Sequence, residues 1–228
     1  MADIVPFFAT PFAFARLPDA ASLNRELGAL FIARAAGGAT QANPRPITQR
    51  NAATFESRFD LFRDPTEPAV RKLKEFCFGE MLRAVCELNG YDTAMRSRLL
   101  VYNDAWFHVT RRGGFFGLHN HPNASWSGVY CVDPGRSDAD HKESGALCFV
   151  NPVLQSSMHL DAGNARLSGA FAGGVRILRL EAGQLVLFPS WVLHDVKPYE
   201  GDGERITVAF NCWFGFKESG AGTGSAPN

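Results

Sequence analysis

The stretch that decides the fold covers residues 183–194, Gly-Gln-Leu-Val-Leu-Phe-Pro-Ser-Trp-Val-Leu-His. The apolar run Gln184–Phe188 is long enough for one buried strand, and Pro189 and Ser190 mark a turn behind it. His194 follows this turn. The stretch therefore predicts a strand, a turn and then an imidazole near the edge of a sheet.

Short runs of the same kind, bounded by turn residues, recur on both sides of this stretch. They are residues 99–109, 126–132, 146–150, 175–180 and 205–214. Aromatic residues make up 12% of the chain, with 19 Phe, which is enough to fill a small barrel or sandwich. Two long polar segments, 134–144 and 155–174, are interpreted as lids at the mouth of the β unit.

Two segments before residue 99 have helical periodicity. In the first, apolar residues recur at steps of three and four from Leu23 to Phe31, before Gly37. The second extends from Val70 to Leu88, with Pro68 suited to its first turn and Asn89-Gly90 to its end. We predict a mainly β protein in which an N-terminal helical scaffold (1–98) packs on a β core (99–217), followed by a flexible tail (218–228).

Charge and composition exclude several classes of protein. Lys plus Arg and Asp plus Glu number 23 each, so the net charge is zero and the basic excess of a nucleic-acid binder is missing. Pro6 and Pro11 interrupt the first apolar stretch, which predicts neither a secretory signal nor a membrane span. Five widely spaced cysteines without a C-x-x-C pair are typical of a reducing compartment, so we expect a cytoplasmic protein.

Three histidines have a spacing typical of a metal site. Side chains at i and i+2 leave the same face of a strand, so His119 and His121 could present two imidazoles to one point. His194, after the strand and turn described above, could complete a facial set of three ligands. A surface pair satisfied by hydrogen bonds is the alternative for the two neighbouring histidines alone.

Arg205 enters the apolar strand Ile206–Phe210 as a lone cation. An unpaired buried guanidinium is unfavourable, so this side chain must meet a partner or face an anionic ligand. Thr207 shares its face, and the two side chains together suit the carboxylate of a small molecule. A salt bridge at the rim, to Asp202 or Glu204, is the alternative.

Four blocks of the sequence carry a resemblance to a known family: residues 118–130, 145–152, 187–198 and 204–211. They resemble the 2-oxoglutarate/Fe(II) oxygenases related to prolyl 4-hydroxylases, over roughly residues 106–213. The resemblance implies a double-stranded β-helix (jelly-roll, cupin-like) fold. It also implies Fe(II) held by His119, His121 and His194, and 2-oxoglutarate anchored by Arg205 with Thr207 assisting.

The sequence departs from the wider superfamily at His121, where a carboxylate ligand is usual. Three neutral imidazoles also describe a zinc site. The resemblance places the strand after the histidine pair against 2-oxoglutarate, which makes Ser127 and Cys131 candidate contacts. Asn211 shares the face of Arg205 and Thr207 if no bulge intervenes, and is a third candidate.

We therefore predict an Fe(II)/2-oxoglutarate dioxygenase that hydroxylates a small molecule or a peptide and releases succinate and CO2. No further catalytic residue is predicted beyond the metal ligands. The alternatives are a three-histidine zinc hydrolase or lyase, and a non-catalytic jelly-roll module that binds a ligand. Neither a nucleic acid nor a membrane is an expected partner, and the exposed sheet face of such a fold could support a homodimer.

Overall fold

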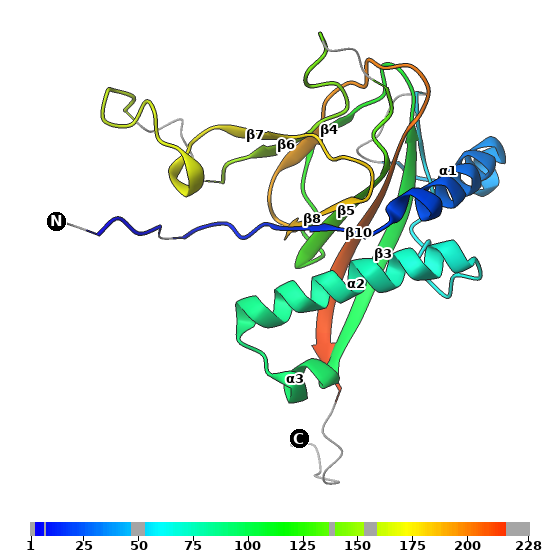
Figure 1. The fold of residues 1–228 in the computed structure, drawn as a ribbon, viewed down its shortest axis with the longest axis horizontal. Helices are drawn as coiled ribbons and strands as arrows, with labels where there is room; N and C mark the ends of the chain where they lie inside the picture. The colour runs from blue at the N-terminus through cyan, green and yellow to red at the C-terminus, as the bar shows by residue number, and fades with distance from the viewer. Residues whose placement is uncertain (1–2, 7, 47–52, 137–139, 153–158, 218–228) are drawn as a thin grey trace, which may run out of the picture.

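The chain folds into three layers: two helices, a large sheet and a small sheet (Figure 1). The structure is a computed structural model and describes residues 3–6, 8–46, 53–136, 140–152 and 159–217. The helices are α1 (Ala20–Ala36), α2 (Pro68–Asn89) and the short α3 (Thr93–Arg98), with 3-10 turns at Gly38–Thr40 and Gly169–Phe171. The strands are β1 (Ala13–Arg16), β2 (Thr54–Glu56), β3 (Leu99–Thr110), β4 (Phe116–His119), β5 (Trp126–Asp133), β6 (Leu147–Val150), β7 (Val175–Leu178), β8 (Gln184–Pro189), β9 (His194–Val196) and β10 (Arg205–Phe216).

The large sheet has the order β1-β8-β5-β10-β3-β2, and all its pairs are antiparallel. β10 lies between β3 and β5 and pairs with β3 over its whole length, from Arg205↔Thr110 to Phe216↔Leu99. Because side chains alternate along a strand, β10 has two different faces. Ile206, Val208 and Phe210 point to the helices, and the intervening residues point the other way.

The main core lies between the helices and this sheet. Leu23, Leu27 and Phe31 recur at four-residue steps on α1 and are buried, so they form one apolar stripe. Phe31 stacks on Phe107 of β3 with ring centroids 4.3 Å apart. The helices thus cover one whole face of the large sheet and leave the other face free for a site.

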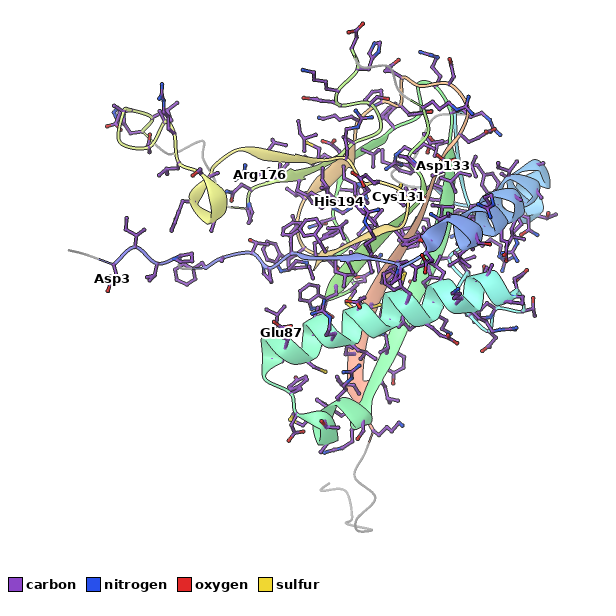
Figure 2. The ribbon with its side chains drawn as sticks, in the orientation of Figure 1. Asp3, Glu87, Cys131, Asp133, Arg176 and His194 are labelled. Atoms are coloured by element: carbon purple, nitrogen blue, oxygen red, sulfur yellow. The ribbon has the colours of Figure 1, made fainter. Side chains whose placement is uncertain are left out.

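The small sheet, β4-β9-β6-β7, covers part of that other face. Phe149 of β6 packs against Phe188 of β8 at 4.8 Å between ring centroids, in a second apolar cluster shared by the two sheets. Cys131 and His194 lie in the region between the sheets (Figure 2). The described strands form two facing sheets of a jelly roll and do not close into a barrel.

The predicted mainly β architecture with N-terminal helices is confirmed. α2 begins at Pro68, and Gly90 ends it with a φ of 65°, a left-handed conformation that glycine adopts at low cost. β1, β2, β9 and α3 were not expected from the sequence. The predicted tail lies outside the described residues, as do parts of both predicted lids.

One local expectation was wrong. His119 and His121 were expected on one strand, but β4 ends at His119, and His121 lies in the loop that follows. Among the described residues, no helix combines the length and the hydropathy needed to cross a membrane.

Gly128 of β5 tests the packing of the large sheet. Its partner in register is Phe210, a fully buried residue whose ring atom would lie 2.3 Å from a Cβ added at Gly128. We expect Gly128→Ala to lower the free energy of unfolding by about 1–3 kcal/mol through overpacking. A Cβ added at Gly79 of α2 meets no atom within 4 Å, so Gly79→Ala should raise this free energy by about 0.5–1 kcal/mol. Urea unfolding of both variants measures the two effects, and equal midpoints would contradict this account of the packing.

Candidate metal centre

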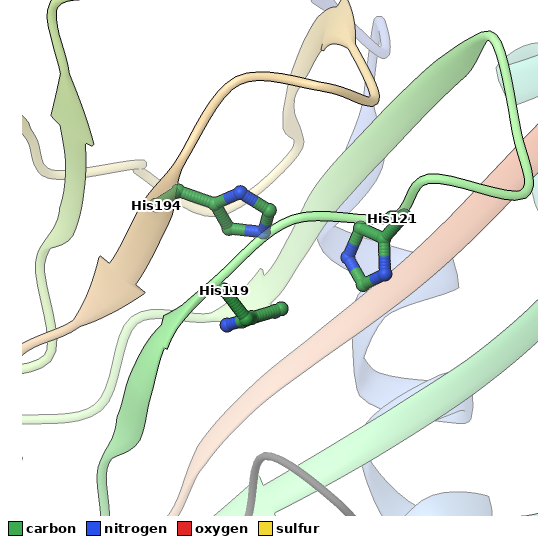
Figure 3. Close-up of side chains that lie close together, drawn as sticks. All are labelled: His119, His121 and His194. Carbon is green, nitrogen blue, oxygen red and sulfur yellow. The ribbon is translucent and has the colours of Figure 1, made fainter.

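Three imidazoles converge between the two sheets. His119 comes from the end of β4, His194 from the start of β9 and His121 from the loop after β4 (Figure 3). Each offers one ring nitrogen, and these nitrogens all lie within 4.8 Å of one another. Among the described residues, this is the only group of three or more His, Cys, Asp or Glu side chains that could hold a metal ion.

The strand pairing and the turn after β8 bring the three rings together. His119 and His194 are direct partners in the antiparallel pair β4–β9, so their side chains leave the same face next to each other. His121 is held through its backbone, because its N–H donates to the carbonyl of Ser190 at 2.9 Å. The side-chain amide of Asn120 also donates to the carbonyl of Trp191, at 3.3 Å.

Backbone carbonyls orient two of the rings. Nδ1 of His119 lies 2.7 Å from the carbonyl of Gly117, and Nδ1 of His194 lies 2.9 Å from the carbonyl of Val192. A carbonyl only accepts hydrogen bonds, so each Nδ1 carries the proton and each Nε2 keeps a free lone pair. This is the arrangement usual for histidine ligands of a metal, and the three residues therefore fit a bound metal ion.

Burial keeps the three rings neutral. It lowers the pKa of His121 to about 3 and that of His194 to about 4, and nearby imidazoles add to both effects. Burial also lowers the pKa of His119 below its usual value. At pH 7 all three rings can therefore donate a lone pair without first losing a proton.

The histidines line a cavity of about 620 Å³ on the inner face of the large sheet. Ring centroids of Phe188 and His194 are 5.0 Å apart, and those of Trp106 and His121 are 6.0 Å apart, so aromatic rings flank the imidazoles. Of the residues predicted to contact a cofactor, Arg205, Thr207, Ser127 and Asn211 line the same cavity.

Arg205 is the unusual charge in this cavity. Its exposed fraction is 5%, and no hydrogen bond or ion pair to its guanidinium is present among the described residues. The two rim acids considered as partners bind other arginines, since Glu204 pairs with Arg111 and Asp202 with Arg112. Burial lowers the pKa of Arg205. An anion in the cavity would provide the missing partner.

Two of the remaining predicted cofactor contacts, Ser127 and Asn211, line the cavity, whereas Cys131 does not. The Ser127 hydroxyl donates to the side-chain oxygen of Asn211 at 2.7 Å and lies 2.8 Å from the Ser190 hydroxyl. The bulge in the β10–β5 pairing leaves Val132 unpaired on β5, so β10 keeps Arg205, Thr207 and Asn211 on one face. Cys131 is almost fully buried in the second apolar cluster and is not among the residues that line the cavity.

Sequence reasoning missed an acidic residue of this cavity, Glu56. Its carboxylate lies 3.1 Å from Nε2 of His108 and accepts a hydrogen bond from Asn43 at 2.6 Å. Burial alone would raise the pKa of Glu56, but His108, Asn43 and His119 outweigh this effect and lower it. The carboxylate is therefore ionised at pH 7. β2, which carries Glu56, has only three residues, too few for a pattern to be recognised.

Comparisons with known proteins agree with this geometry. Residues 104–211, which include all three histidines and Arg205, match the family model described as "Putative 2OG-Fe(II) oxygenase". No curated protein matches the sequence.

Solved structures of low sequence identity share the fold. A prolyl-4-hydroxylase from Pseudomonas putida is 18% identical over 92% of this chain and 94% of that chain, with a TM-score of 0.59. A prolyl hydroxylase from Trichoplax adhaerens, solved with a peptide fragment of hypoxia inducible factor, is 13% identical over 89% and 83%, with a TM-score of 0.54. The epimerase SnoN, solved with Fe3+, alpha ketoglutarate and nogalamycin RO, is 12% identical over 96% and 89%, with a TM-score of 0.58. These likenesses confirm the predicted jelly-roll fold.

Substitution of His194 tests the metal centre. We expect His194→Ala to weaken the binding of Co(II) by more than ~100-fold, because a ligand is lost and the loss of even an outer-shell partner costs about 10–100-fold. Titration calorimetry under argon measures the affinity. The matched control is His159→Ala, which removes an imidazole that is 89% exposed and should leave the affinity unchanged. Equal affinities of the two variants would place the metal elsewhere.

Proposed function

We propose that the chain is a 2OG-Fe(II) oxygenase, because residues 104–211 match the model of that family, and that it uses Fe(II) and 2-oxoglutarate to hydroxylate a small molecule or a peptide. In this proposal His119, His121 and His194 hold the iron. Arg205 and Thr207 hold the far carboxylate of 2-oxoglutarate.

One observation carries the proposal: a single cavity contains both a set of three neutral imidazoles and a buried arginine that has no hydrogen-bond or ion-pair partner within the described part of the chain. A zinc hydrolase needs the imidazoles but has no use for the arginine. A dicarboxylate that chelates a metal through one end needs a cation at its other end, and Arg205 supplies it with a planar fork of donors.

The chain's own residues bind, orient and exclude water. Arg205 and the Thr207 hydroxyl fix one end of 2-oxoglutarate, while the rings of Phe188 and Trp106 keep the region of the imidazoles dry. When bound, Fe(II) with 2-oxoglutarate supplies the oxidising chemistry, in which O2, 2-oxoglutarate and a C–H bond give a hydroxyl group, succinate and CO2. Three protein ligands leave the other positions of the metal open for these molecules.

The size of the cavity supports a second bound molecule. About 620 Å³ is within the range of sites that hold drug-sized ligands, which are larger than 2-oxoglutarate. The Trichoplax enzyme was solved with a peptide fragment and SnoN with nogalamycin RO, so proteins of this fold bind molecules of both kinds. SnoN is an epimerase, and hydroxylation is therefore our proposal for this chain.

Two further sequence expectations stay predictions. All five cysteines are free and buried, which agrees with a reducing, cytoplasmic environment. A homodimer through an exposed sheet face also remains to be measured.

We expect Arg205 to strengthen the binding of 2-oxoglutarate and to lower the stability of the ligand-free protein. Without an anion its buried charge is unfavourable, so we expect Arg205→Met to raise the free energy of unfolding of the ligand-free protein by ~1 kcal/mol or more. The same variant should bind 2-oxoglutarate at least ~100-fold more weakly in the presence of Ni(II). Thermal unfolding with and without 2-oxoglutarate measures both effects. Arg83→Met, at an exposed pair on α2, is the control that should change neither. A 2-oxoglutarate affinity unchanged in Arg205→Met would contradict the assigned role.

Anaerobic spectroscopy tests the proposed function as a whole. Addition of Fe(II) and then 2-oxoglutarate under argon should produce the visible charge-transfer band of a chelated 2-oxo acid. The band should be absent in His194→Ala and Arg205→Met and present in His159→Ala and Arg83→Met. Subsequent admission of O2 should release succinate.

The opposite result would identify a different chemistry. If metal binds but the band never forms, the three imidazoles serve another reaction. Hydrolysis supported by Zn(II) and indifferent to 2-oxoglutarate would then favour the zinc enzyme. If 2-oxoglutarate binds but no succinate is released with any substrate, the chain is a binding module.

A further inference from the structure

Asp104 of β3 is an acidic residue of the cavity with no assigned role. Its carboxylate is half-buried and lines the cavity. Among the described residues, no hydrogen bond or ion pair engages this carboxylate. The other acid of the cavity, Glu56, is held by Asn43 and His108. Asp104 is therefore a negative charge in a partly dry site that is free to bind a ligand.

The position of Asp104 is on the opposite side of the metal centre from Arg205. β10 pairs Arg205 with Thr110, Ala209 with Trp106 and Asn211 with Asp104. Since Trp106 packs against His121, the row of Trp106 and Ala209 lies beside the metal centre. Along β10, Arg205 lies four residues before Ala209 on the same face of the sheet. Along β3, Asp104 lies two residues before Trp106, and because the strands are antiparallel it lies on the other side of this row from Arg205. The proposed 2-oxoglutarate end and the Asp104 end of the cavity are thus separate.

Two stacked aromatic pairs border Asp104 along the strand. Phe59 stacks on Trp106 at 4.4 Å, and Tyr102 stacks on Trp213 at 6.1 Å between centroids. Tyr102 and Trp106 are the same-face neighbours of Asp104 on β3, two residues before and two after it. Phe59, Tyr102 and Trp213 are 40%, 46% and 38% exposed. Phe59 and Trp213 line the cavity, and Tyr102 is joined to it through Trp213. Exposed aromatic surface beside a cavity is typical of a binding site.

A carboxylate with aromatic residues as its neighbours along the strand favours a particular kind of ligand. The faces of Trp, Tyr and Phe attract cations, and cages of such rings recognise ammonium groups. A carboxylate adds a charge-assisted hydrogen bond and repels an anion. Asn211, across from Asp104, is oriented because its side-chain oxygen accepts the bond from Ser127, which leaves its NH2 group for other contacts.

We propose that Asp104, with Trp106, Trp213, Tyr102 and Phe59, forms a substrate subsite for an alkylammonium group. The substrate is then a primary or methylated amine on an aliphatic chain, either free or as a basic side chain of a peptide. This inference deepens the proposed function and rests on it for the location of the oxidised carbon, which lies between the ammonium group and the three histidines.

The subsite also keeps the amine away from the metal. A neutral amine is a good ligand for a first-row metal ion and would compete with O2 and 2-oxoglutarate. Pairing with Asp104 favours the protonated form, which has no lone pair to donate. The Asp104 carboxylate would therefore both bind the ammonium group and keep the amine from binding the metal.

A set of three matched probes tests the subsite. n-Butylammonium, 1-butanol and butyrate share an aliphatic chain and differ in charge. Their affinities are measured by ligand-observed NMR with metal-free protein and with protein loaded with Ni(II) and 2-oxoglutarate, which cannot turn over. We expect n-butylammonium to bind at least ~10-fold more tightly than the other two probes.

Variants assign the effect to the named residues. Asp104→Asn keeps the shape of the side chain and should weaken n-butylammonium binding ~10-fold, whereas Trp213→Leu should weaken it about 2–5-fold. Glu75→Gln, at an exposed acid of α2, should have no effect. If Asp104→Asn fails to fold, Trp213→Leu, which changes a partly exposed residue, still tests whether n-butylammonium binds at this subsite.

The outcomes separate this inference from the proposed function. An unchanged affinity in Asp104→Asn and Trp213→Leu, or equal binding of butyrate and n-butylammonium, would overturn the subsite whatever 2-oxoglutarate does. If n-butylammonium binds as expected to the metal-free protein but 2-oxoglutarate does not bind, the proposed function fails and the ammonium subsite stands. Arg205→Met should lose only the 2-oxoglutarate binding.

Discussion

The antiparallel pairing of β10 with β3 and β5 is the constraint on which the rest of the structure depends. Period-two alternation divides β10 into two sets of side chains. Ile206, Val208 and Phe210 face α1 and α2 and complete the main core, while Arg205, Thr207, Ala209 and Asn211 face the cavity. A shift of the register by one residue would exchange the two sets and would bring a guanidinium into the core. Stability and site are therefore fixed by the same pairing.

The polar groups that face the cavity lower the stability of the fold, and the apolar core on the other face of the sheet compensates for this loss. Three desolvated imidazoles and a guanidinium that no described residue pairs with are arranged around one cavity. Such groups lower stability until ligands satisfy them. On the other side of the sheet, the stacked pair Phe31–Phe107 and the buried stripe of α1 supply apolar burial. One face of the sheet therefore supplies stability and the other supplies the site, as is expected of a binding site built on a rigid sheet.

The sequence was sufficient to predict the elements that follow a simple period. α2, with Pro68 at its start and Gly90 at its end, and β10, with Arg205 among apolar residues, could be recognised. The three histidines could be grouped because a strand and a turn limit where His194 can lie. Glu56 and Phe59 could not be assigned to the site, since they come from a three-residue strand and the loop behind it. Their contacts with His108 and Trp106 depend on tertiary packing, which no local pattern encodes.

In the proposed function, the charges around the cavity offset those of the metal and of 2-oxoglutarate, although none of the proposed metal ligands is a carboxylate. Glu56 does not belong to the three-ligand group, yet it acts electrostatically on His119 and is ionised. The charges of a divalent metal and Arg205 together equal in magnitude those of a 2-oxoglutarate dianion and Glu56. Among the described residues that line the enclosed part of the cavity, Asp104 then carries the remaining charge, because Arg45 at the mouth is exposed and screened by water. A substrate that carries one positive charge would leave the filled cavity neutral, which is the lowest-cost state for a desolvated site.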